Sequence, residues 1–261
     1  MEKKRVYPDV SQFPPEIMSI LDGAAFYDSS CSPEAVVVFA EKNGGYFLKT
    51  SGKGSLYRES VMTKFFHEKK LAAAVLAYVS DERDWLLTER VPGDDCTALK
   101  HLEQPERLCD TIAETLLDLH GMDYTGCPVR NHTEIYTQTA VKNYRAGKYD
   151  ESLFPDNWGY ASAEEAFRTV EGQGSLLASD TLLHGDYCLP NVMLDGWKLS
   201  GYVDLCNGGV GDRHVDIFWA GWSLSWNLKS AKYRERLYDA YGRASIDETR
   251  LRIVAAHEVF G

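Results

Sequence analysis

Residues 184–191 read HGDYCLPN, and Asp204 follows thirteen residues after the asparagine that ends this stretch. The sequence therefore places two carboxylates and one amide, at Asp186, Asn191 and Asp204, around one short loop and the segment after it. A carboxylate can orient and deprotonate a hydroxyl group, while an amide oxygen and a second carboxylate can hold Mg²⁺. Phosphoryl transfer from ATP requires this set of groups.

The residues that follow fit a β-hairpin. Residues 192–194 (VML) predict a short strand, residues 195–196 (DG) a tight turn and residues 199–205 (LSGYVDL) the returning strand. Such a hairpin has Asn191 at its entrance and Asp204 near its exit, so both are expected to reach one metal ion. A solvated loop with ordinary polar residues is the alternative, and the number of concordant signals argues against it.

The spacing Asp-x₄-Asn also matches the catalytic loop of protein kinases, with Gly185 where those enzymes carry arginine. His184 and Asp216 are expected to be structural, with His184 bonding backbone carbonyl groups. Only eleven residues separate Asp204 from Asp216, too few for the activation segment that docks a peptide. The stretch predicts a kinase-like site, but not a protein kinase.

Two charged residues nearer the N-terminus suit the nucleotide half of such a site. Lys49 ends a predicted strand that is otherwise apolar, and Glu59 lies in the first turns of a predicted helix. In kinases a strand lysine binds the α- and β-phosphates, and a helix glutamate holds that lysine. Two exposed charges are the alternative, but the downstream motif favours the kinase interpretation.

Two further segments are candidates for contacts with a nucleotide. Residues 28–34 (DSSCSPE) predict a loop between two strands, and its serines could approach phosphates. An ordinary hairpin loop is the alternative. Residues 85–91 (WLLTERV) lead out of the predicted sheet into the Pro-Gly pair at 92–93, where a two-lobed kinase has the hinge that binds adenine through its backbone.

Composition limits the class of protein. The chain has 261 residues, 44% of them hydrophobic, and a formal net charge of −11, so it can bury a large core and form two lobes. The acidic balance disfavours nucleic acid and membrane partners and favours a cationic small molecule, unless it serves solubility alone. No apolar run approaches the ~20 residues of a membrane span, and no signal peptide is recognisable. Six scattered cysteines argue against a zinc site or a disulfide framework and predict a cytoplasmic location.

Hydrophobic patterning predicts an α+β chain with two lobes, and together with the kinase-like motif it indicates a protein-kinase-like bilobal fold. Residues 1–91 are expected to form a nucleotide-binding N-lobe, an antiparallel five-stranded sheet with one helix across it. Its strands are predicted at 24–27, 35–40, 46–49, 72–79 and 84–90. Residues 92–261 are expected to form a mainly helical C-lobe with the catalytic loop and the substrate-binding cleft. Its helices are predicted at 106–120, 134–146, 163–171, 216–228, 233–241 and 247–259.

These motifs resemble those of the aminoglycoside phosphotransferases and are similar to the 3′-phosphotransferase (kanamycin kinase) group of antibiotic-resistance enzymes. The resemblance extends over nearly the whole chain. Two elements have no general kinase rationale: Leu119-His120 with Cys127-Pro128, and the ending Glu258-Val259-Phe260. The other matching stretches are Ser32-Pro33, Lys49 with Glu59, 85–93 (WLLTERVPG), 184–191, 201–205 (GYVDL) and 212–217 (DRHVDI).

The resemblance implies a role for each candidate residue of the nucleotide site. Lys49 would bind the α- and β-phosphates of ATP, with GTP as a possible substitute, and Glu59 would fix the lysine. Ser32 would lie in the nucleotide loop. Backbone groups of Glu89 and Val91 would hold adenine.

The resemblance also implies the catalytic and acceptor residues. Asp186 would be the catalytic base, and Asn191 and Asp204 would be the Mg²⁺ ligands. Asp156 and Glu258 match acidic positions of a cleft that binds polycationic sugars, and each would pair with a substrate ammonium group.

Three positions depart from the family pattern. Residues 225–227 (SWN) lack the carboxylates that the best-known members carry on this helix, Asn207 stands where some members have arginine, and Gly261 follows Phe260. The departures leave the ATP chemistry untouched and bear on the range of acceptors.

The predicted function is therefore transfer of a phosphoryl group from MgATP to a hydroxyl of an aminoglycoside, expected to be the 3′-hydroxyl. A related kinase for choline, a sugar or an amino alcohol is one alternative. A nucleotide-binding regulatory module without turnover is another, but it would need a damaged catalytic set, and this one is complete. A monomer or weak dimer is expected, with no nucleic acid or membrane partner.

Overall fold

The computed structural model describes residues 4–30, 35–149 and 158–261. The chain divides into two compact units, one of Met1–Gly93 with Ser200–Cys206, the other of Asp94–Leu199 with Asn207–Gly261. The first unit thus ends two residues beyond the lobe boundary predicted from the sequence, and it also takes in a short segment from much later in the chain. That segment carries Asp204.

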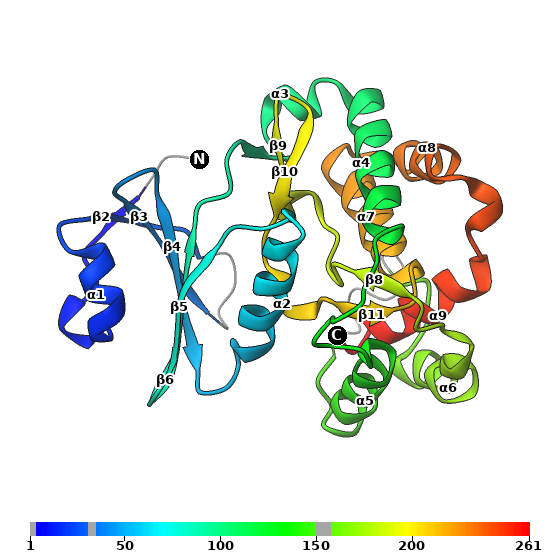
Figure 1. The fold of residues 1–261 in the computed structure, drawn as a ribbon. Coiled ribbons are helices and arrows are strands. Elements are labelled where there is room, and N and C mark those ends of the chain that lie inside the picture. The colour runs from blue at the N-terminus through cyan, green and yellow to red at the C-terminus, as the bar shows by residue number, and fades with distance from the viewer. Residues whose placement is uncertain (1–3, 31–34, 150–157) are drawn as a thin grey trace. The chain divides into compact units, whose positions relative to one another are not determined.

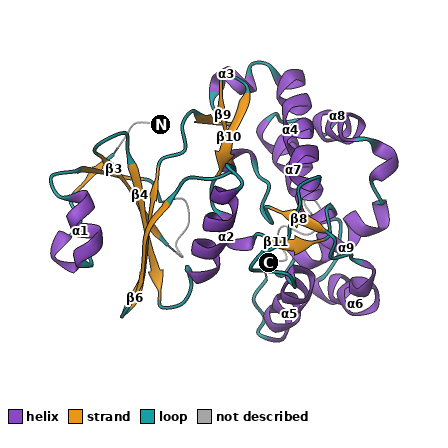
Figure 2. Cartoon of the chain, viewed as in Figure 1, coloured by secondary structure: helices purple, strands orange, loops and turns teal. Residues whose placement is uncertain are grey.

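The first unit is built on a six-stranded antiparallel sheet in the order β1-β2-β3-β4-β6-β5. Figure 1 labels β2 to β6 of this sheet, and Figure 2 shows its strands in orange. Its strands are β1 (Arg5–Val6), β2 (Ala25–Asp28), β3 (Val36–Glu41), β4 (Tyr46–Gly52), β5 (Val75–Ser80) and β6 (Arg83–Glu89). The five predicted strands are all present. The additional strand, β1, is an edge strand in which Arg5 pairs with Tyr27, and two residues are too few to show a periodicity.

Helices α1 (Pro15–Leu21) and α2 (Tyr57–Glu68) lie on opposite faces of this sheet (Figure 1). Ile17 and Leu21 of α1 pack in one buried cluster with Leu48 of β4. Successive side chains of a strand point to opposite faces. Lys49, the next residue of β4, therefore points to the α2 side.

The second unit is mainly helical (Figure 2). Its helices are α3 (Leu99–Leu102), α4 (Pro105–His120), α5 (His132–Arg145), α6 (Ala163–Gln173), α7 (His214–Asn227), α8 (Lys232–Tyr241) and α9 (Glu248–Glu258). The six predicted helices are present with small shifts at their ends, and α3 is an additional single turn. In α4 the predicted apolar face, Leu108, Ile112, Leu116 and Leu119, is buried. Helix α7 packs against α4, α8 and α9.

Short strands support the loops between these helices. Strand β8 (Thr181–Leu183) pairs antiparallel with β11 (Gly209–Gly211), and β7 (Asp94–Asp95) pairs with β9 (Val192–Asp195). Strand β10 (Lys198–Tyr202) returns beside β9. The prediction of a strand to residue 205 is wrong at its end, because Asp204 has a φ of +59° and lies outside β10. The 3-10 helices are η1 (Val10–Gln12), η4 (Gly174–Leu176), η5 (Leu189–Asn191), η6 (Leu205–Asn207) and η7 (Arg243–Ser245).

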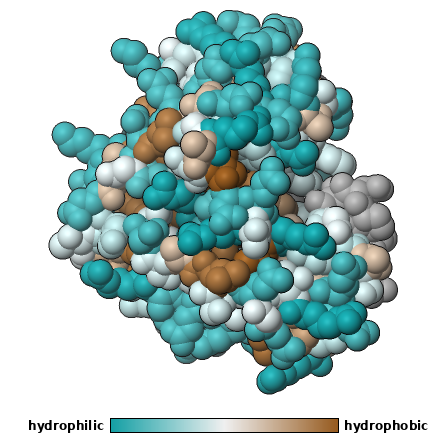
Figure 3. All heavy atoms as spheres, turned by 90° about the vertical axis from the view of Figure 1, so that its right-hand side faces the viewer, coloured by the Kyte–Doolittle hydropathy of each residue, from teal (hydrophilic) through white to brown (hydrophobic). Residues whose placement is uncertain are grey.

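The surface drawn in Figure 3 is mostly hydrophilic and shows a few separate hydrophobic patches. This pattern accords with the net charge of −11. None of the helices in the described ranges is long and apolar enough to cross a membrane.

Candidate active site

In the first unit, Lys49 lies between two carboxylates. Its Nζ is 2.7 Å from Oε2 of Glu59, on α2, and 3.0 Å from Oδ1 of Asp204. Burial of Lys49 opposes its positive charge, but the two carboxylates outweigh burial and raise its pKa above the ordinary value. Lys49 is therefore a permanent cation, and the structure brings together three of the residues selected from the sequence.

The two carboxylates differ in their surroundings. The side chain of Glu59 is 8% exposed and that of Asp204 is 44% exposed. Burial and the negative charge of Asp204 raise the pKa of Glu59, partly offset by the attraction of Lys49. Glu59 thus holds the lysine from inside the unit, whereas Asp204 lies where solvent, or a bound cation, can reach it.

Asp84 fixes the start of α2, and the sequence analysis missed it. It is fully buried, and its carboxylate accepts hydrogen bonds from the backbone N–H groups of Gly54 and Leu56 and from the hydroxyls of Tyr78 and Ser80. Both N–H groups lie just before α2: Leu56 is its N-cap residue, whose own side chain caps nothing, and Gly54 belongs to the turn that leads into it. The only signal in the sequence is that Asp84 precedes an apolar run. An aspartate at such a place is easily mistaken for a turn residue.

The other nucleotide candidates are only partly described. Ser32 lies outside the described residues. The backbone N–H of Glu89 donates to the carbonyl of Ala74 at 3.0 Å, so this N–H is already occupied within the sheet. Val91 is buried and packs close to Gly201. Their predicted contact with adenine stays a prediction.

In the second unit, Asp186 follows β8 and is held by Asn191. The Nδ2 of Asn191 donates to the backbone carbonyl of Asp186 and to its Oδ2, each at 3.0 Å. The five-residue spacing between the two therefore closes a small ring that fixes the carboxylate. Because both bonds use the amide nitrogen, the carbonyl oxygen of Asn191 is the atom left to bind a cation.

Asp216, on α7, anchors the loop before Asp186. Its buried carboxylate accepts the backbone N–H groups of His184 at 2.8 Å and Gly185 at 2.7 Å, and His120 lies 3.4 Å away. The structural role predicted for Asp216 matches these contacts. The Nδ1 of His184 accepts the backbone N–H of Asp186 at 3.2 Å, and the bond predicted from His184 to a backbone carbonyl stays a prediction.

Gly185 is required by a close approach of two backbone segments. It has a φ of +86°, and a Cβ at this position would lie 2.1 Å from the carbonyl oxygen of Asn207. No L-residue fits without displacing that backbone. This contact explains why glycine occupies the position at which protein kinases carry arginine.

Helix α7 supports the loop along its length. The Oγ of Ser223 accepts the backbone N–H of Leu189 at 3.0 Å, and Asn227 donates to Ser223. On the other side, the hydroxyl of Tyr187 donates to Thr115 of α4 at 2.9 Å. The loop is thus fixed by buried hydrogen bonds on both sides, which limits the positions that Asp186 can take.

Glu258 lies at the end of α9 near this loop. Its Oε1 accepts hydrogen bonds from the hydroxyl of Tyr136 at 2.5 Å and from Nε1 of Trp219 at 3.0 Å. Burial raises the pKa of Glu258 to about 7; the two hydrogen bonds lower it and the negative charge of Asp186 raises it further. Asp156, the other predicted acceptor residue, lies outside the described residues.

The donor chemistry fits Mg²⁺ held together with phosphates. The described ranges contain no cluster of three or more His, Cys, Asp or Glu residues that could bind a metal alone. Mg²⁺ in phosphoryl-transfer sites usually has one or two carboxylates, with the remaining ligands from phosphates and water. The exposed carboxylate of Asp204 and the amide carbonyl of Asn191 are donors of this kind, although the structure describes them in separate units.

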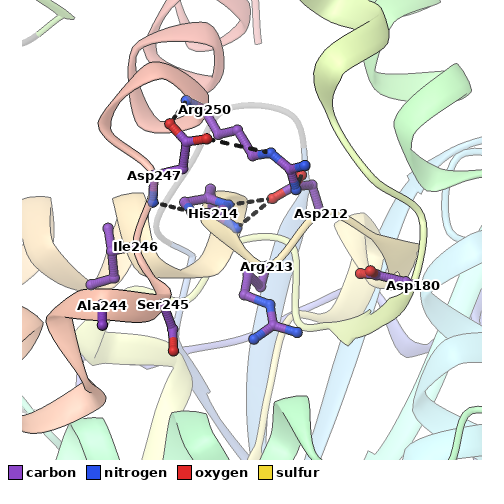
Figure 4. Close-up of a pocket in the computed structure, with 9 residues that line it drawn as sticks. All are labelled: Asp180, Asp212, Arg213, His214, Ala244, Ser245, Ile246, Asp247 and Arg250. Carbon is purple, nitrogen blue, oxygen red and sulfur yellow. Dashed lines mark hydrogen bonds and ion pairs between the residues drawn. The ribbon is translucent and has the colours of Figure 1, made fainter.

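A cavity of about 270 Å³ elsewhere in the second unit contains none of these residues (Figure 4). Asp212 binds His214 at 2.6 Å and Arg250 at 3.0 Å, and the backbone N–H of Asp247 donates to His214 at 2.8 Å. Burial raises the pKa of Asp212, but hydrogen bonds from His214 and from the backbone N–H of Ala178 prevail and lower it. The cluster joins the starts of α7 and α9, so we interpret it as structural.

The sequence matches the phosphotransferase enzyme family over residues 26–254. A probable aminoglycoside 3′-phosphotransferase of Lactococcus lactis is 44% identical over 260 residues, which are 99% of this chain and 98% of that protein. An aminoglycoside 3′-phosphotransferase of Niallia circulans is 29% identical over 70% of each chain.

Solved structures confirm the predicted fold class. An aminoglycoside 3′-phosphotransferase of type VIII superimposes with a TM-score of 0.77 and 22% identity and covers 96% of both chains. An aminoglycoside phosphotransferase of Streptomyces rimosus also has a TM-score of 0.77, with 18% identity over 97% of this chain and 99% of that one. The chain belongs to the phosphotransferase enzyme family, within its aminoglycoside 3′-phosphotransferase group.

Proposed function

We propose that this protein transfers the γ-phosphoryl group of MgATP to a hydroxyl of an aminoglycoside, and that this hydroxyl is the 3′-hydroxyl. The observation that carries the proposal is the Asp186 carboxylate, fixed by Asn191 at 3.0 Å in a loop that Asp216 anchors. The relative from Lactococcus lactis, which covers nearly the whole chain, supports an aminoglycoside over choline or another metabolite as acceptor.

Asp186 would orient the acceptor hydroxyl and accept its proton as the bond to phosphorus forms. Phosphoryl transfer passes through a loose transition state, so positioning contributes more than strong basicity. The bonds from Asn191 suit this role, because they hold the carboxylate in place without removing its charge.

Lys49 would neutralise the α- and β-phosphates, with Glu59 keeping its ammonium group in position. Asn191 and Asp204 would hold Mg²⁺, which neutralises charge on the phosphates when bound. In the described structure Lys49 contacts Asp204 directly. Binding of nucleotide and cation would therefore exchange that contact for phosphate contacts.

Proteins of the same fold support a nucleotide and an aminoglycoside as the two ligands. The Streptomyces rimosus enzyme is known with ADP and streptomycin. Another phosphotransferase of this fold is known with AMP-PNP and hygromycin B, and a third with GDP and kanamycin. Both ATP and GTP therefore belong in the assay of this protein.

The test is coupled ADP or GDP release with a panel of aminoglycosides, choline and simple amino alcohols. Turnover is expected with aminoglycosides that carry a 3′-hydroxyl and not with their 3′-deoxy counterparts, and phosphorus NMR of the product locates the phosphate. Turnover of choline or an amino alcohol alone would replace the proposal with a metabolite kinase. Turnover of the 3′-deoxy compounds would still show phosphorylation of an aminoglycoside, but at a hydroxyl other than the 3′-hydroxyl.

A further inference from the structure

Four of the six tryptophans of the chain gather beside α7: Trp158, Trp219, Trp222 and Trp226. We call them the tryptophan wall. The rings of Trp222 and Trp226 are stacked with centroids 5.6 Å apart and an angle of 8°, and Trp158 stacks on Trp222 at 6.3 Å. Trp219 meets the edges of Trp158 and Trp222 at 5.8 and 5.5 Å. The wall is thus one continuous aromatic surface.

The wall runs from the edge of the core to the surface, because Trp158 and Trp219 pack against buried clusters and Trp226 does not. The buried face of α7 is formed by residues such as Val215, Ala220 and Leu224, whereas Trp219 and Trp222 are half-buried and Trp226 is 56% exposed. Keeping an indole in water forgoes the stabilisation that its burial would give. A function for this surface would account for the arrangement.

The inner end of the wall lies beside the predicted catalytic loop. Trp219 donates from Nε1 to Glu258, whose raised pKa owes part of its shift to the charge of Asp186. Ser223, one residue after Trp222, holds the backbone of Leu189 in that loop. The wall therefore leads from the surroundings of Asp186 outward to Trp226.

The outer end of the wall already receives a cation. Nζ of Lys229 lies 4.5 Å from the ring centroid of Trp226, within the range of a cation–π interaction. Lys229 comes directly after α7 and has a φ of +55°. An ammonium group is thus compatible with the exposed ring of Trp226.

We propose that the tryptophan wall binds the ammonium-bearing rings of the acceptor, with Trp226 as a specificity-determining residue and Lys229 as an intramolecular competitor for its ring. The inference rests on the proposed function. Residues 225–227 provide no carboxylate at this place, so the contacts would be cation–π contacts to amino groups and stacking of the wall on the faces of the sugar rings.

The experiment measures the Kd of the full chain for neomycin by calorimetry and, in parallel, the KM for neomycin and for ATP. Trp226→Ala is expected to raise the Kd and KM for neomycin about 2- to 30-fold, the range of one cation–π contact, with the KM for ATP unchanged. Trp226→Phe should retain most of the affinity because it keeps an aromatic face. Trp226→Leu should lose it although it stays apolar.

Two further comparisons isolate the charge. Lys229→Ala is expected to lower the Kd because the substrate no longer displaces a resident cation, whereas Lys229→Arg keeps the competitor and should not. Paromomycin, which differs from neomycin by a hydroxyl in place of one amino group, should lose less affinity in Trp226→Ala if that amino group contacts the ring.

The matched control is Trp197→Ala. Trp197 also has a cation over its ring, Arg107 at 4.3 Å, but it lies in the turn between β9 and β10 and its ring contacts His101. An unchanged neomycin Kd in a folded Trp226→Ala protein, or equal affinity in Trp226→Leu and Trp226→Phe, would overturn the wall proposal alone. If neomycin binding depends on Trp226 but no aminoglycoside is turned over, the role of the wall in binding would stand and the proposed reaction would be overturned.

Discussion

The two units hold their predicted active-site charges in different ways. In the first, Lys49 is fixed by full charges, the carboxylates of Glu59 and Asp204. In the second, Asp186 is fixed by the neutral amide of Asn191, and its negative charge helps to raise the pKa of Glu258. The ion pairs keep Lys49 charged at all physiological pH values. The amide instead positions Asp186 and leaves its negative charge available for a hydroxyl proton or a cationic acceptor.

The largest effect is expected from removing the Asp186 carboxylate. Asp186→Ala should lower kcat about 10²- to 10⁴-fold, the usual contribution of a general base, with nucleotide affinity unchanged. Steady-state kinetics and a nucleotide titration measure the two quantities. Asp118→Ala, at an exposed position on α4, is the control and should behave as wild type. Near-normal turnover in Asp186→Ala would remove this residue from the mechanism.

Lys49→Met tests the charged half of the comparison. It leaves the buried carboxylate of Glu59 without a partner, so the free energy of unfolding should fall by about 3 kcal/mol, and activity should be lost. The double variant Lys49→Met/Glu59→Gln should recover stability but not activity. Urea denaturation measures the stability of the two variants, and steady-state kinetics measure their activity. Lys53→Met, at an exposed site, is the control. Equal stability of Lys49→Met and the control would contradict a structural ion pair.

Gly185→Ala tests how tightly the uncharged half is built. The new Cβ would meet the Asn207 carbonyl at 2.1 Å in addition to the strain of a positive φ. Gly126→Ala has a similar φ of +81° but nothing within 4 Å, so it isolates the backbone strain of about 1 kcal/mol. Gly185→Ala should cost about 1–3 kcal/mol more and lower kcat. Equal stability of the two variants would mean that the loop can move aside.

Glu258 is expected to make the stability of the protein depend on pH. Its pKa is about 7 in the folded protein against an ordinary 4.5, so between these values the unfolded chain has lost the proton and the folded chain has kept it. Stability due to Glu258 is therefore fully present below pH 4.5 and is lost as the pH rises through 7.

Thermal unfolding of wild type and Glu258→Gln across pH 4–8 measures this contribution. The difference between the two proteins should change in this window, because the variant cannot titrate at this position. Other groups, such as His257 with its pKa lowered to about 4 by burial, cancel in the comparison. A constant difference across the window would contradict the raised pKa.

Much of the fold was predictable because its elements have strong local signals. Helix α4 repeats apolar residues at helical spacing, and the strands from β2 to β6 are apolar runs separated by turn residues. Strand β1 was not predicted because it is only two residues long. Strand β10 ends before the predicted residue 205 because Asp204 takes a left-handed conformation, which an aspartate tolerates. Neither feature has a periodicity to read.

The sequence by itself determined the set of reactive groups, because Asp186, Asn191, Asp204 and Lys49 occur in a spacing and an order that few other chemistries require. It could not determine what holds them. Asp84 under α2, Asp216 beneath Gly185 and the bond from Asn191 to Asp186 depend on segments 28 or more residues apart, or on the shape of one tight loop. The alignment of four indoles along α7 depends equally on packing. Chemistry follows from the identity of side chains, whereas position and substrate contact follow from long-range contacts that only the folded chain makes.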